Sequence, residues 1–123
     1  GMVAHQRGQH DEAVELIQNA IALDPDTAVY HGNLGVALRA QGRIEEAIHA
    51  YRRAIELDPT YPEAHWNLGN AFRKQKKFDK AVTAYRRALQ SRPNFADAHR
   101  GLTAALRESG RLDDASASYR QAT

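Results

Sequence analysis

The sequence repeats itself with a period of 34 residues, and this period constrains the fold more than any other feature. The run His-Trp-Asn-Leu-Gly at 65–69 corresponds to His-Gly-Asn-Leu-Gly at 31–35 and to His-Arg-Gly-Leu-Thr at 99–103. Segments 28–61 and 62–95 are identical at 14 of their 34 aligned positions. A fixed period of this length is typical of stacked helix–turn–helix repeats, in which each repeat buries its apolar face against its neighbours.

Apolar residues within each repeat recur at three- and four-residue steps, which places them on one face of a helix. The first full repeat therefore predicts one helix from about Ala28 to Ala40 and a second from about Ile44 to Leu57. Proline closes each repeat because it lacks a backbone donor and disfavours helical geometry in the residue before it. We expect one domain built of a partial leading repeat, two full repeats and a truncated last repeat, at 1–27, 28–61, 62–95 and 96–123.

Glycines suggest where helices end. Gly8 is expected to end a short helical segment at 2–7, and Gly42 and Gly110 stand where a left-handed helix C-cap is expected. Lys76 occupies the equivalent position of the second full repeat. Because lysine adopts that conformation reluctantly, the geometry of this turn is left open.

Small and aromatic residues recur at matching positions of the repeats. Glycine and alanine let two helices approach closely, and tyrosine fills the space beside them. These positions are Gly35 and Gly69; Ala47, Ala54, Ala81 and Ala88; and Tyr51, Tyr85 and Tyr119. In the last repeat a second helix is expected to carry Leu112, Ala115, Tyr119 and Ala122.

The Leu-Gly steps, the four alanines, the tyrosines and the closing prolines together resemble the tetratricopeptide repeat (TPR) motif over essentially the whole chain. The resemblance implies an all-α fold, a right-handed α-solenoid of antiparallel helix hairpins, that acts as a protein-interaction scaffold. The Asn-Leu-Gly steps at Asn33 and Asn67 resemble more narrowly the superhelical repeats attached to O-linked N-acetylglucosamine transferases, whose equivalent asparagines hold the backbone of a bound peptide. Gly101 replaces this asparagine in the last repeat, so the row of asparagines is expected to end at Asn67.

The resemblance places side chains of the first helix of each repeat in a concave, peptide-binding groove. An amide offers both donors and an acceptor to an extended backbone, tryptophan offers an apolar anchor, and arginine favours a carboxylate. The predicted groove residues are Asn33, Arg39, Trp66, Asn67, Asn70, Arg73, Lys74, Arg100 and Arg107. The alternatives are that Trp66 only packs on a neighbouring helix and that the asparagines make structural hydrogen bonds.

Catalysis, a cofactor and a metal site are not expected. No nucleophile–base arrangement or glycine-rich phosphate loop stands out. His31, His65 and His99 lie on equivalent helices roughly 10 Å apart, whereas zinc needs its nitrogen ligands at about 2.0–2.1 Å. We expect these histidines to be half-buried packing residues.

Charge and composition narrow the partners. The 17 basic and 15 acidic residues leave a surplus of two, too small to indicate nucleic acid. The basic pair Arg52-Arg53 is expected on the outer side of the array, with Glu56 pairing with Arg52. The absence of cysteine and of a membrane-spanning run suggests a soluble, cytoplasmic protein. The TPR resemblance implies a protein or peptide partner. Two alternatives remain: the segment belongs to a larger enzyme, or the chain self-associates through uncapped repeat ends.

Overall fold

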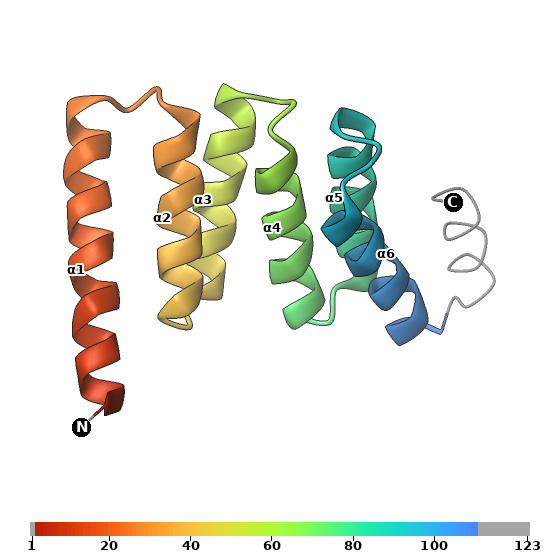
Figure 1. Cartoon of the computed structure of the whole chain (residues 1–123), viewed down its shortest axis with the longest axis horizontal. Coiled ribbons are helices and arrows are strands. Elements are labelled where there is room, and N and C mark those ends of the chain that lie inside the picture. Colours follow the sequence, from red (N-terminus) through yellow and green to blue (C-terminus); the bar gives the residue numbers. More distant parts are fainter. Residues whose placement is uncertain (1, 111–123) are drawn as a thin grey trace. The chain divides into compact units, whose positions relative to one another are not determined.

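The computed structural model describes the backbone of residues 2–110 and the side chains from residue 8 onward. Within this range the chain forms helices and no strands (Figure 1). The helices are α1 (Met2–Leu23), α2 (Ala28–Ala40), α3 (Ile44–Leu57), α4 (Pro62–Lys74), α5 (Phe78–Ser91) and α6 (Ala96–Glu108). The chain divides into two compact units between Pro59 and Thr60. The predicted all-α fold class is confirmed, and the helices of the first full repeat have the predicted bounds.

The first unit contains the α2–α3 hairpin, with α1 packed against α2. The apolar positions predicted for α3 face this interior, since Ala47, Tyr51 and Ala54 have no exposed surface. Leu38 of α2 is buried with them. The three- and four-residue spacing of apolar residues in the sequence thus identified the buried face of the hairpin.

The second unit contains the α4–α5 hairpin, and α6 packs against both α5 and α4. Tyr85 of α5 is fully buried. A Cβ atom added at Gly69 would lie 2.7 Å from the Tyr85 ring, and one added at Gly101 would lie 2.5 Å from it. The tyrosine ring therefore fills space that only glycine leaves open on α4 and on α6. Gly101, which departs from the Asn-Leu-Gly pattern, has a packing role.

The turns that end α2, α4 and α6 share one conformation. Gly42, Lys76 and Gly110 have φ angles of 80°, 61° and 83°. The backbone N–H of Lys76 donates to the Arg73 carbonyl oxygen at 2.9 Å, as that of Gly42 does to the Arg39 carbonyl at 2.8 Å. The question left open at Lys76 is settled: the turn is the left-handed type, and lysine adopts it.

The expectation that Gly8 ends a short helix is wrong. Helix α1 runs without a break from Met2 to Leu23. A glycine inside a helix costs only about 0.5–1 kcal/mol relative to alanine, and the space around Gly8 is open. No neighbouring side chain therefore forces a turn at Gly8. The predicted second helix of the last repeat, with Leu112, Ala115, Tyr119 and Ala122, lies outside the described residues.

Candidate functional site

The predicted groove residues of the first unit lie on α2. Asn33 is exposed and Arg39 is half-buried. Val29 and Val36 lie on the same face as Asn33, at i, i+4 and i+7 spacing. Their exposed fractions are 48% and 40%, high for large apolar side chains. We call Val29, Asn33 and Val36 the α2 face; it is an apolar surface with one amide at its centre.

The asparagines of α4 lie in a different environment from Asn33. Asn67 is buried, with 9% of its surface exposed. Asn70 is half-buried, and its Oδ1 atom accepts a hydrogen bond of 2.5 Å from the Tyr85 hydroxyl. Asn70 thus makes a structural hydrogen bond to the adjacent helix α5.

Trp66 packs on an aromatic neighbour. Its ring is 5.7 Å from that of Phe95, measured between centroids, and it lies against a cluster of Ala88, Phe95 and Ala98. The Arg92 guanidinium lies over the other ring of this pair, 4.6 Å from the Phe95 centroid. Trp66 is half-buried as a result, so it does pack on its neighbours, as the alternative interpretation of this residue expected.

The basic groove residues of the second unit differ in their pairing. Arg73 Nε lies 3.5 Å from a Glu108 carboxylate oxygen, and Arg100 pairs with Asp97. Lys74 and Arg107 are exposed. Two of the four predicted cations of this unit therefore already have a carboxylate partner within the unit.

Burial raises the pKa values of the Tyr51 and Tyr85 hydroxyls, and a nearby arginine opposes this in each case. Arg39 acts on the pKa of Tyr51, and Arg73 acts on the pKa of Tyr85. The two arginines thus act in the same direction on the tyrosine of their own hairpin, and Arg73 also lowers the pKa of Tyr85 through a side-chain hydrogen bond. The Tyr51 hydroxyl is buried and makes no hydrogen bond within the described residues.

The periodic histidines His31 and His99 contact a backbone carbonyl oxygen, a role that the sequence analysis did not predict. His31 and His99 each place Nε2 near the carbonyl oxygen of the proline six residues earlier, at 2.8 Å from Pro25 and 2.7 Å from Pro93. Because a carbonyl oxygen only accepts, Nε2 carries the proton and donates. The constant spacing of six residues from proline to histidine was the available signal. Among the described residues, no group of three or more His, Cys, Asp or Glu side chains is placed to hold a metal ion.

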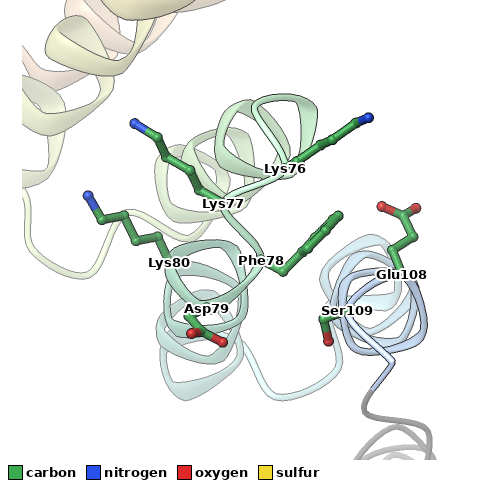
Figure 2. A pocket seen from close by; sticks show the side chains of 7 residues that line it. All are labelled: Lys76, Lys77, Phe78, Asp79, Lys80, Glu108 and Ser109. Carbon is green, nitrogen blue, oxygen red and sulfur yellow. The ribbon is translucent and has the colours of Figure 1, made fainter.

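An open hollow of about 580 Å³ lies between the α4–α5 turn and the end of α6. Figure 2 shows that Lys76 extends on the side of Glu108, whereas Lys77 and Lys80 extend the other way. The Lys80 ammonium lies 5.7 Å from the centre of the Phe72 ring. Because the lysines diverge, they do not form a common site for one anion.

The paired arginines of the second helices are exposed. On α3, Glu56 contacts Arg53, with a nitrogen–oxygen distance of 3.1 Å, and Arg53 is also 4.0 Å from Asp26. The sequence analysis expected Glu56 to pair with Arg52, and that pair stays a prediction. The contact of Arg53 with Glu56 spans three residues, and such exposed pairs contribute little to stability.

The helix hairpins, their left-handed turns and their glycine–tyrosine contacts define a helical repeat protein. The family model described as TPR repeat matches residues 1–39, 35–75 and 69–106. The chain belongs to the TPR repeat family.

Several solved structures of MamA have a fold similar to that of this chain. One crystal structure of MamA protein has 28% sequence identity and a TM-score of 0.86, and the match covers 92% of this chain and 62% of that one. A second MamA crystal structure has 29% identity and a TM-score of 0.87, with 94% and 67% covered. A MamA mutant has 25% identity and a TM-score of 0.76, with 91% and 65% covered. The chain thus spans somewhat under two thirds of the first of these structures. No curated protein matches the sequence.

These similarities define the class of function. TPR repeats bind protein partners and are typically interaction modules rather than catalytic domains, so membership of this family agrees with a protein-interaction scaffold. No helix in the described part of the chain is long and apolar enough to cross a membrane.

Proposed function

We propose that this chain is a scaffold that binds an extended peptide segment of a protein partner along the first helices of its repeats, in the concave groove that the TPR resemblance implies. The observation that carries the proposal is the α2 face, where an exposed amide, Asn33, lies between two exposed valines. An exposed amide beside apolar surface suits a ligand that offers backbone groups and short apolar side chains.

The asparagine of the Asn-Leu-Gly step supplies the backbone contact in this proposal, as in the transferase-associated repeats that the sequence resembles. Asn33 serves this role in the first unit. In the second unit Asn67 is buried, so its part in ligand binding would require that its amide reach the ligand from a largely covered position. Trp66, Asn70, Lys74, Arg100 and Arg107 complete the proposed contact set with Arg39 and Arg73.

An array of random 10-residue peptides, probed with the labelled chain, tests this function. We expect capture of a subset of peptides with micromolar affinity. The variant Asn33→Ala should weaken capture several-fold, while Asn94→Ala, an exposed asparagine in the loop before α6, should leave it unchanged. Amide resonances that move on peptide addition should cluster on α2 and α4. Capture that is insensitive to Asn33→Ala, with shifts confined to α3 and α5, would move the site to the second helices.

A second candidate function, self-association, is favoured by one observation. Leu16 and Leu23, seven residues apart on one face of α1, are exposed by 61% and 89%. One and two repeats after Leu16, the sequence has Ala50 and Ala84, which are buried. A position that is buried elsewhere in the repeat is thus occupied here by an exposed leucine.

Light scattering of the parent and of Leu16→Lys at high concentration tests self-association. A dimer mass that reverts to the monomer mass in the variant supports it. A monomer mass for both proteins excludes it.

A further inference from the structure

Side chains at equivalent positions of the two units differ in their ion-pair and hydrogen-bond partners. In the second unit the Arg73 guanidinium is paired with the Glu108 carboxylate, and Asn70 accepts from Tyr85. In the first unit the corresponding residues are Arg39 and Val36. Arg39 has no acidic partner among the described residues, and Val36 is exposed.

The sequence explains why Arg39 has no such partner. Helix α2 contains no aspartate or glutamate. One repeat before Glu108 the sequence has Lys74, so no carboxylate stands at the sequence position that corresponds to Glu108. A half-buried guanidinium without a counter-ion favours a carboxylate from elsewhere, because charge-assisted hydrogen bonds to arginine are stronger than neutral ones.

The pair formed by Arg73 and Glu108 shows what such a carboxylate does in this fold. The charge of Arg73 lowers the pKa of Tyr85 and the charge of Arg39 lowers the pKa of Tyr51, each against the larger effect of burial. A glutamate from a neighbouring helix satisfies Arg73 at 3.5 Å. The second unit therefore carries an internal example of the contact that Arg39 lacks.

Resting on the proposed function, we propose that the first unit sets ligand specificity: the α2 face takes two apolar side chains of an extended peptide, and Arg39 takes an acidic side chain that follows them. Val29 and Val36 are seven residues apart, which is about 10.5 Å along a helix axis. Side chains three residues apart in a polyproline-II backbone are separated by about 9.3 Å. The partner is thus an extended segment with two apolar residues three apart and a glutamate or aspartate one or two residues beyond.

Fluorescence anisotropy with defined peptides tests this assignment on the full chain. The probe is a fluorescein-labelled 10-residue peptide with two leucines three residues apart and a glutamate two residues after the second, in a Gly/Ser/Pro background. One comparison peptide has glutamine for glutamate, and another has serine for both leucines. We expect glutamine to weaken binding by about tenfold, the size of one charge-assisted contact, and the double serine change to weaken it by about a hundredfold, because it removes two apolar side chains.

Matched variants identify the residues. Arg39→Ala should abolish the preference for glutamate over glutamine, whereas Arg87→Ala, at an exposed position of α5 outside the proposed contact set, should preserve it. Val36→Asn should abolish the preference for leucine over serine. Rising salt concentration should weaken binding of the glutamate peptide more than binding of the glutamine peptide.

Two outcomes overturn the assignment, and they differ in what else they remove. Equal binding of the glutamate and glutamine peptides, or a preference that survives in Arg39→Ala, overturns the role of Arg39 and leaves peptide binding in place. If no peptide binds on the random array and none binds in this assay, the proposed function is removed together with the specificity built on it.

Discussion

The Tyr85 hydroxyl donates a hydrogen bond to Asn70 Oδ1 at 2.5 Å, whereas the equivalent Tyr51 hydroxyl is buried without a partner among the described residues. The difference follows from one position. Val36 stands one repeat before Asn70 and has no acceptor to offer. Two rings of the same type, buried to the same extent, thus differ in whether their polar atom is satisfied.

We expect the two tyrosines to respond differently to removal of the hydroxyl. Tyr85→Phe should destabilise the protein by about 1 kcal/mol because it breaks a buried hydrogen bond, while Tyr51→Phe should be neutral or stabilising because it removes an unsatisfied group. Val36→Asn should stabilise by a similar amount if the new amide accepts from Tyr51. Urea denaturation measures all three, and equal losses for the two phenylalanine variants would contradict the difference in hydrogen bonding.

Stability should fall at alkaline pH. Burial raises the pKa values of Tyr51 and Tyr85 above that of an exposed tyrosine, near 10. The folded state then holds these protons more tightly than the unfolded state does, so their contribution is fully present below pH 10 and is lost as pH rises through the folded pKa values. Melting temperatures between pH 8 and pH 11.5 check this. The double variant Tyr51→Phe with Tyr85→Phe should show a smaller decline, and an identical decline would assign the effect to other groups.

Lys76→Gly should stabilise the protein by up to about 1 kcal/mol. Lys76 has a φ of 61°, in the left-handed region, where a side chain is costly and glycine is not. Lys77→Gly is the control, since Lys77 has a φ of −91° and gains nothing from glycine. Thermal unfolding of both variants decides, and a loss of stability in Lys76→Gly would mean that the lysine side chain contributes more than its backbone conformation costs.

Ala81→Leu should destabilise by about 1–3 kcal/mol, the usual effect of overpacking a tight helix contact. Ala81 has no exposed surface. Gln90→Leu, on an exposed position of the same helix, is the matched control and should change stability little. A melting temperature of Ala81→Leu equal to that of the parent would show that the α4–α5 contact has room for a larger side chain.

Gly8→Ala and Gly101→Ala should have opposite effects. Gly8 lies inside α1 with nothing close to a new Cβ, so alanine should stabilise the helix by about 0.5–1 kcal/mol. A Cβ at Gly101 would lie 2.5 Å from the fully buried Tyr85 ring, so alanine should destabilise the second unit by about 1–3 kcal/mol. Chemical denaturation compares them. Destabilisation by Gly8→Ala would favour the break at this glycine that the sequence pattern predicted.

The sequence alone determined the bounds of α2 and α3, the buried faces of the hairpins and the family, but not the extent of α1. These features are local or periodic: apolar spacing, closing prolines and small residues recur every 34 positions, so the bounds of α2 and α3 and the burial of Tyr51 and Tyr85 could be predicted. The nine predicted groove residues were chosen in the same way and remain a prediction.

Only the tertiary structure decided how equivalent positions differ. Asn33 is exposed and Asn67 is buried although both belong to the same Asn-Leu-Gly step, and Arg73 has a carboxylate partner on another helix while Arg39 has none among the described residues. Periodicity assigns one role to every copy, but the state of a side chain depends on neighbours brought in from other helices. The chain specifies those neighbours only through packing, and a one-dimensional pattern does not show which polar groups they leave unsatisfied.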